Sequence, residues 1–233
     1  MFLRQDLVTP PQEPEQSSRV PMDKRHVMTK YMAVVAGLAV VAGIGLSAWY
    51  IQSAGSGDRF AECRQSQVSG GAGAIGGPFT LTDQDGNTVT QADVITRPTL
   101  IYFGYTFCPD VCPLDNARNA EAADILEERG IEVTPVFISV DPARDTPEVL
   151  RGYVDNLHPR MIGLTGTDAQ IRTATQAYKA YFKVQPSQDE FYLVDHSTFT
   201  YLVLPEIGFV DFFRRESTPD EMADRVACFI NAM

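Results

Sequence analysis

The sequence predicts an α/β domain that follows a single membrane-spanning helix. Three observations support this class: an uncharged apolar run near the N-terminus, continuous apolar segments typical of central strands, and threonine-capped helices between those segments. Apolar residues make up 44% of the chain, which is enough for a packed core. The net charge of −11 argues against nucleic-acid binding, because that function requires a basic surface.

The apolar run occupies residues 32–51, MAVVAGLAVVAGIGLSAWYI. At ~1.5 Å per residue it spans about 30 Å, the thickness of the hydrocarbon core of a bilayer. We expect an uncleaved transmembrane anchor over residues 31–51, since the apolar region of a signal peptide usually has only about 7–15 residues. Trp49 and Tyr50 lie at its far end, where interfacial aromatic residues belong.

Basic residues before the anchor predict its orientation. Lys24, Arg25 and Lys30 favour a cytoplasmic N-terminus, so that the rest of the chain is exported. Residues 1–30 are rich in proline and polar residues, and we expect a disordered cytoplasmic tail. A mitochondrial transit peptide would be poor in acidic residues, whereas this tail carries Asp6, Glu13, Glu15 and Asp23. The expected location is therefore a bacterial inner membrane, with a periplasmic C-terminal domain.

The exported part is predicted to contain a linker over 52–75 and one domain over 76–233. Asp85-Gly86-Asn87 is a strong hairpin signal, and Thr146, Thr167 and Thr218 have the positions of helix N-caps. The predicted elements in chain order are a hairpin at 79–90, a strand at 99–105, a helix at 111–129, a strand at 133–140, a helix from Pro147, a strand at 161–166, a helix from Asp168 through Tyr181, a strand at 191–195 paired with one at 199–204, a strand at 209–213, and a last helix from Pro219.

This order is that of a thioredoxin-like fold with an N-terminal hairpin and insertions. In such a fold the first helix begins at the carboxyl end of a central strand, where ligands gather in open α/β sheets. Cys108 and Cys112 stand at this position in the segment TFCPDVCP. The chemistry of the protein is therefore expected at this edge.

The spacing of Cys108 and Cys112 limits what the pair does. Residues i and i+4 of a helix have Cβ atoms ~5–6 Å apart, whereas a disulfide requires about 3.5–4.5 Å. Two thiolates on one metal, with bonds of about 2.3 Å, tolerate a wider separation, and a helix N-terminus favours thiolates. The spacing fits a two-thiolate metal site better than a fast dithiol–disulfide switch, but it leaves both open.

Among the three histidines, His196 is the candidate for a third ligand. A histidine between two predicted strands is more often a hydrogen-bonded core residue. The position of His196 nevertheless favours a role as a ligand, because the loop before a late strand in this fold faces the start of the first helix. His158 precedes Pro159 at a predicted helix end and is expected to be structural, and His26 lies on the cytoplasmic side.

Four segments together resemble the Sco/SenC family of copper-binding assembly factors for cytochrome c oxidase: FTLTDQDG, YFGYTFCPDVCP, ISVDPARDTPEVL and VDHSTFTYLVLPEIG. The resemblance covers residues 76–233 and implies copper, Cu(I) or Cu(II), with Cys108, Cys112 and His196 as ligands. Asp110 and Asp195 also match residues typical of the family, although a helix-start acid and a turn acid would explain them too. Asp141 is expected to be a turn and capping residue.

The resemblance implies a membrane-anchored copper chaperone. It would deliver copper to the binuclear copper centre of cytochrome c oxidase subunit II, or prepare that centre. The alternative is a thiol–disulfide reductase that keeps the oxidase copper-site cysteines reduced, for which His196 is not needed. A copper or redox sensor is a third reading, but the tail has no recognisable output domain. We therefore expect a metallochaperone rather than an enzyme, with oxidoreductase activity left open.

Two further cysteines, Cys63 and Cys228, lie outside the motif. An exported free thiol oxidises and competes for Cu(I), so a disulfide between them is the simplest explanation. The other reading of Cys228 is a small buried apolar residue of the last helix.

Overall fold

The computed structural model describes residues 24–55, 58–65, 68, 71–186 and 191–233. The chain forms two compact units, 1–57 and 58–233. In the first unit, helix α1 spans Lys24–Gly55, and its segment Tyr31–Tyr50 is long and apolar enough to cross a membrane. The helix begins at Lys24 and so includes residues 24–30, which the sequence analysis assigned to the tail. The part of that expectation concerning residues 1–23 lies outside the described residues.

The second unit is built on a mixed seven-stranded sheet with the strand order β2-β1-β5-β4-β3-β8-β9. Strands β3, β4 and β5 are parallel, and β1, β8 and β9 pair antiparallel with their neighbours. The strands are β1 Thr80–Asp83, β2 Thr88–Thr90, β3 Thr99–Gly104, β4 Thr134–Ser139, β5 Ile162–Thr165, β8 Thr200–Leu204 and β9 Gly208–Phe213. The helices are α2 Gln91–Val94, α3 Val111–Glu128, α4 Pro147–Asp155, α5 Asp168–Ala177 and α6 Pro219–Asn231, with a 3₁₀ turn at Ala72–Ala74.

Local sequence signals account for most of these elements. Every residue of β3 and β4 is buried, as expected of central strands covered on both faces. Thr146, Thr167 and Thr218 accept backbone hydrogen bonds at the starts of α4, α5 and α6. Helix α3 ends at Glu128, ahead of Gly130, which has a positive φ of 77°. The predicted α/β class and thioredoxin-like order are confirmed.

The region after α5 differs from the sequence prediction. Helix α5 ends at Ala177 rather than Tyr181, because Lys179 adopts a left-handed conformation with φ of 54°. Strand β7, Val194–His196, pairs with β6, Phe182–Val184, in a separate two-stranded sheet and not with the strand at 200–204. Strand β6 and helix α2 were not predicted, since elements of three or four residues give no clear periodicity.

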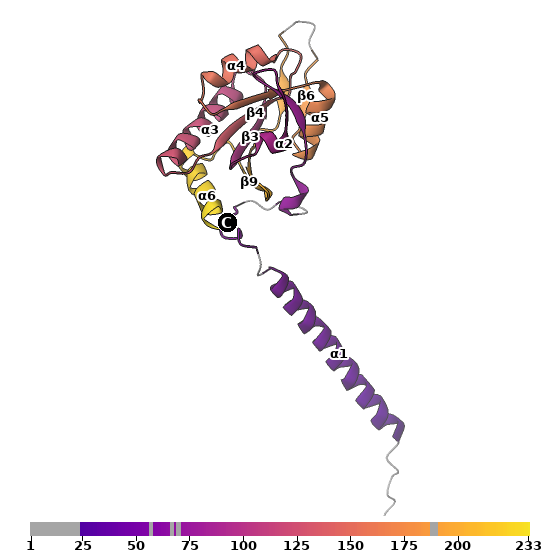
Figure 1. The fold of residues 1–233 in the computed structure, drawn as a ribbon. Helices are drawn as coiled ribbons and strands as arrows, with labels where there is room; N and C mark the ends of the chain where they lie inside the picture. The colour runs from indigo at the N-terminus through magenta and orange to yellow at the C-terminus, as the bar shows by residue number, and fades with distance from the viewer. Residues whose placement is uncertain (1–23, 56–57, 66–67, 69–70, 187–190) are drawn as a thin grey trace, which may run out of the picture. The chain divides into compact units, whose positions relative to one another are not determined.

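The compact domain begins at Asp58, well before the expected residue 76. Phe60 and Cys63 are buried in a core cluster with α3, β9 and α6, so part of the expected linker packs as domain. Helices α3 and α6 lie next to each other beside the sheet (Figure 1). The segment at the start of the domain is thus held against its last helix.

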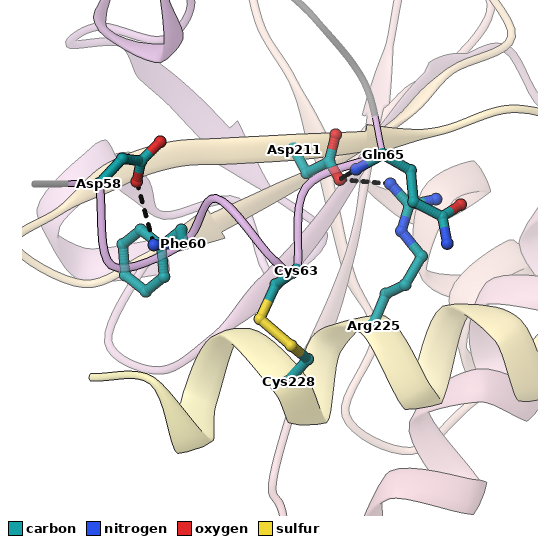
Figure 2. The surroundings of a disulfide bond; sticks show 7 residues. All are labelled: Asp58, Phe60, Cys63, Gln65, Asp211, Arg225 and Cys228. Carbon is teal, nitrogen blue, oxygen red and sulfur yellow. Dashed lines mark hydrogen bonds and ion pairs between the residues drawn. A yellow bond between two sulfur atoms is a disulfide. The ribbon is translucent and has the colours of Figure 1, made fainter. Parts of the chain in front are cut away.

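A disulfide and several polar contacts hold this segment (Figure 2). Cys63 and Cys228 form a disulfide that joins the segment to α6. The Arg64 side chain donates to the Val210 carbonyl at 3.0 Å. The buried Asp211 carboxylate accepts from the Gln65 backbone N–H and pairs with Arg225 of α6. Cys63 and Cys228 therefore belong to one core cluster, whereas Cys108 and Cys112 belong to another.

Replacing both Cys63 and Cys228 with serine is expected to lower the melting temperature without changing the metal stoichiometry. The disulfide closes a sequence separation of 165 residues, for which chain entropy gives an upper bound of about 5 kcal/mol. Calorimetry of the detergent-solubilised chain measures the loss, with the wild-type protein in reductant as the control. Free alkylation of both cysteines in unreduced protein would contradict the pairing.

Candidate metal centre

The two motif cysteines lie where strand β3 passes into helix α3. Cys108 belongs to the connecting loop, and Cys112 is the second residue of the helix. The helix N-terminus directs backbone N–H groups at the sulfurs, and the Cys112 N–H lies 3.5 Å from the Cys108 sulfur. Cys108 is 7% exposed and Cys112 is fully buried. Both cysteines are free thiols in the structure.

Gly104, the last residue of β3, allows this close approach. A Cβ atom built on Gly104 would lie 2.8 Å from the Cys112 sulfur and 2.9 Å from the Tyr102 ring. Real Cβ atoms do not approach other atoms so closely, so only glycine fits here. The sequence interpretation did not single out Gly104, although a glycine at the end of an apolar strand was the available signal.

His196 reaches the same point from the end of β7. Its Nε2 atom lies 3.3 Å from the Cys112 sulfur, across a sequence separation of 84 residues. Its Nδ1 atom lies 2.9 Å from the Ser197 carbonyl oxygen. A carbonyl oxygen only accepts, so Nδ1 carries the proton and Nε2 presents its lone pair to the sulfurs. The rings of Tyr102 and Tyr105 meet the imidazole edge to face.

The structure thus brings together the three residues expected as ligands. The potential ligand atoms of Cys108, Cys112 and His196 all lie within 4.8 Å of one another. Cys108 and His196 line a hollow of about 420 Å³, whereas Cys112 lies beneath it. Two sulfurs and one imidazole nitrogen form a donor set for a soft or borderline metal ion.

The two thiols share one proton unequally. The pKa of Cys108 is lowered, chiefly because the Cys112 thiol donates a hydrogen bond to its sulfur. The backbone N–H groups of Asp110 and Cys112 also lower this pKa, whereas burial acts in the opposite direction. The pKa of Cys112 is raised because its proton serves this bond and because the side chain is buried. Cys108 is therefore the thiolate and Cys112 the thiol in the metal-free protein.

Asp110 and Asp195 lie at the mouth of the hollow and not in the ligand cluster. Both are exposed. Asp110 is the N-cap residue of α3 but makes no capping hydrogen bond with its side chain, and Asp195 accepts from the Gln185 amide. Their placement agrees with contacts around the ligands rather than with ligation.

Two further aspartates, Asp141 and Asp145, lie in the segment after β4 and form hydrogen bonds near the site. Asp141 is buried, pairs with Arg144 and accepts from the Tyr192 hydroxyl at 2.6 Å, as expected of a structural acid. Asp145, which the sequence interpretation missed, accepts from the Thr106 backbone N–H at 3.0 Å and from the Thr106 and Ser139 hydroxyls. It thereby holds the start of the loop that carries Cys108. In the sequence, Asp145 is the second acidic residue of the segment DPARDTP, and this was the only local indication of its role.

A second cluster consists of Asp124, Glu127 and His158, and its hydrogen bonds argue against a metal site there. Its ligand atoms also lie within 4.8 Å of one another. However, the His158 Nδ1 atom accepts from the Arg160 N–H at 3.0 Å, so the neutral ring carries its proton on Nε2, facing Asp124 at 3.2 Å. Arg160 also pairs with Glu127 at 2.7 Å. This cluster is an ion-pair network without a free lone pair on nitrogen, in agreement with the structural role expected of His158.

A thioredoxin-like domain with two cysteines and a histidine around one hollow defines a class of proteins that use thiolates as metal ligands or redox groups. Comparison with known proteins makes this more specific. The family model described as SCO1/SenC matches residues 67–231, and the chain belongs to this family.

The most similar relatives include proteins from bacteria and plants. Protein SenC of Rhodobacter capsulatus is 53% identical over 208 residues, which cover 89% of this chain and 94% of the relative. Protein SCO1 homolog 1, mitochondrial, of Arabidopsis thaliana is 44% identical over 68% of this chain, a match that spans about half (48%) of that relative. The crystal structure of Arabidopsis thaliana ScoI with copper bound shares 42% identity and a TM-score of 0.66, covering 69% of this chain and 100% of that one.

Cys108 is expected to react with iodoacetamide at a rate that hardly changes between about pH 5 and pH 8, because its lowered pKa of about 3 keeps it a thiolate throughout. An ordinary thiol, with a pKa of about 8.5, would slow about tenfold per pH unit over this range. Peptide mass spectrometry measures the rate for the metal-free protein, with Cys108→Ser as the control. Faster modification of Cys112, or an ordinary pH profile, would contradict the assignment of the thiolate.

Proposed function

We propose that this protein is a membrane-anchored copper chaperone that binds copper through Cys108, Cys112 and His196. The observation that carries the proposal is the convergence of two sulfurs and one free imidazole nitrogen at an open hollow. Membership of the SCO1/SenC family and the likeness to a ScoI protein with copper bound support copper as the metal.

The donor set suits copper in both oxidation states. Soft thiolates favour Cu(I), and an imidazole nitrogen added to them suits Cu(II). The three proposed ligands leave one coordination position without a protein ligand. Such a site releases its metal by ligand exchange more readily than a site with four protein ligands. The copper is therefore cargo that enters and leaves through the hollow beside Cys108.

The proposed acceptor is the binuclear copper centre of cytochrome c oxidase subunit II. The similar structure of BsSco is described as that of a member of the Sco family of cytochrome c oxidase assembly proteins, which supports this partner. The proposed organisation is a cytoplasmic tail, an anchor over residues 31–51 in the bacterial inner membrane, and a periplasmic domain, which the apolar segment Tyr31–Tyr50 and the basic residues before it support. A reporter that is active only in the periplasm, fused after Met233, tests this topology.

A thiol–disulfide reductase is the second candidate, and one observation favours it. Cys108 is a thiolate on the wall of the hollow, and Cys112 lies beneath it as a thiol. An accessible thiolate backed by a second thiol is the arrangement of a dithiol reductant, which would keep the oxidase copper-site cysteines reduced. Such a reductant does not need His196, whereas the copper proposal does.

Single substitutions are expected to separate the roles of the three ligands. Cys108→Ser or Cys112→Ser should abolish tight Cu(I) binding, because each removes one of only two thiolates. His196→Ala should keep much of the Cu(I) affinity but lose the thiolate-to-Cu(II) charge-transfer absorption, since Cu(II) requires the nitrogen ligand. Chelator competition and visible absorption measure these changes, with His158→Ala as the matched control. An unchanged Cu(II) spectrum in His196→Ala would exclude it as a ligand.

The function itself is tested by mixing the purified protein with apo subunit II. If the protein is a chaperone, the copper-loaded form transfers one copper ion to prereduced subunit II, and His196→Ala weakens transfer from the Cu(II) form. If it is a reductase, the metal-free dithiol form reduces disulfide-containing subunit II, and His196→Ala leaves this reaction intact. Electron transfer without any metal transfer would overturn the copper proposal.

A further inference from the structure

A second hollow, of about 780 Å³, lies at the edge of the sheet opposite to the candidate metal centre. Val203 of β8 lines it and pairs with Thr99 at the start of β3, whereas Cys108 follows the end of that strand. A strand of six residues is about 20 Å long, so the second hollow is separate from the metal centre. Its volume is within the range of small-molecule sites, roughly 300–1,000 Å³.

The walls of the second hollow are mostly apolar. Ile75, Ile95 and Phe209 contribute side chains, and Gly73 contributes backbone. A Cβ atom built on Gly73 would meet no atom within 4 Å, so this part of the wall is open. Among the described residues of the lining, Glu206 has the one charged side chain. Its carboxylate disfavours an anion, so the walls suit a neutral and largely apolar molecule.

Tyr178 also lines the second hollow, and its hydroxyl has no hydrogen-bond partner among the described residues. The side chain is fully buried, and the rings of Phe79, Phe103 and Tyr201 hold it with centroids 6.5, 5.6 and 5.6 Å away. Burial raises the pKa of the hydroxyl, so it keeps its proton and remains a donor. Buried polar groups in folded proteins are nearly always paired, so this donor indicates a missing acceptor.

We propose that the second hollow binds a neutral, largely apolar molecule whose carbonyl oxygen accepts a hydrogen bond from the Tyr178 hydroxyl. A carbonyl group only accepts, which complements this donor without adding a charge beside Glu206. The apolar walls enclose the rest of the molecule.

The membrane is the expected source of this ligand. In the proposed topology the apolar segment ends at Tyr50 and the domain begins at Asp58, so membrane components are the apolar molecules available to the domain. Acyl esters and isoprenoid quinones both carry a carbonyl group on an apolar body. The inference goes beyond the proposed copper function, because none of the three proposed copper ligands lines the second hollow.

Photoreactive probes test the site on the full chain in nanodiscs of diether phosphatidylcholine, a lipid without a carbonyl group. The probes are a monoacylglycerol and a ubiquinone analogue, each carrying a diazirine, and peptide mass spectrometry locates the cross-links. At least one probe should give saturable cross-links in segments 72–77 and 203–209 that the unlabelled compound competes away. The probe that binds identifies the source. Cross-links of both probes to α1 alone would overturn the inference.

Two substitutions test the assigned contacts. Tyr178→Phe should raise the half-saturating probe concentration about fivefold, because one hydrogen bond is lost. Ala72→Phe should abolish the cross-links, because it adds a ring to the lining. Tyr201→Phe is the matched control, since Tyr201 is buried beside Tyr178 but does not line the second hollow, and Ala169→Phe is an exposed control on α5. If Ala72→Phe does not fold, an unchanged concentration in Tyr178→Phe still overturns the inference.

The melting temperature without ligand distinguishes the proposed ligand from a buried water molecule. Tyr178→Phe should be at least as stable as the wild-type protein, because the substitution removes a buried donor that has no partner. A lower melting temperature would indicate a structural water on this hydroxyl and would overturn the inference. Copper stoichiometry should be the same in all four variants, so the failure of this inference and the failure of the copper proposal are measured separately.

Discussion

The close approach of the Cys112 sulfur to Gly104 is the constraint on which the site depends. It fixes the start of α3 against the end of β3, because no side chain fits between them. The helix N-terminus then lies at the carboxyl edge of the sheet, where its backbone N–H groups favour the thiolate of Cys108. Asp145 secures the connecting loop through Thr106. Packing and electrostatics therefore act at the same junction.

The comparison of two histidines shows how hydrogen bonding distinguishes a candidate metal ligand from a structural histidine. The Nδ1–H group of His196 donates a hydrogen bond to a backbone carbonyl, so the lone pair of Nε2 faces the two sulfurs. The Nδ1 atom of His158 accepts a hydrogen bond from a backbone N–H group, so Nε2 carries the proton of the neutral ring. Both residues belong to clusters of suitable size, but only the cluster with His196 presents a complete set of lone pairs to a metal.

Stability and chemistry are assigned to separate pairs of cysteines. Cys63 and Cys228 join the segment at the start of the domain to its last helix, supported by Asp211 and Arg225. Cys108 and Cys112 form no disulfide and lie beyond the carboxyl end of β3. Because the two pairs belong to different core clusters, the domain is cross-linked without using the two cysteines of the proposed metal site.

The sequence by itself determined the membrane-length helix, the central strands, the threonine caps and the CxxxC motif, because each of these signals lies within a few neighbouring residues. It did not predict β6 or the early start of the domain at Asp58, whose signals are short or depend on burial against distant elements. Only the tertiary structure decided which nitrogen of His196 faces the sulfurs and that Gly104 leaves room for Cys112. These facts depend on contacts between residues far apart in the chain, such as the 84 residues between Cys112 and His196, and no local pattern encodes such geometry.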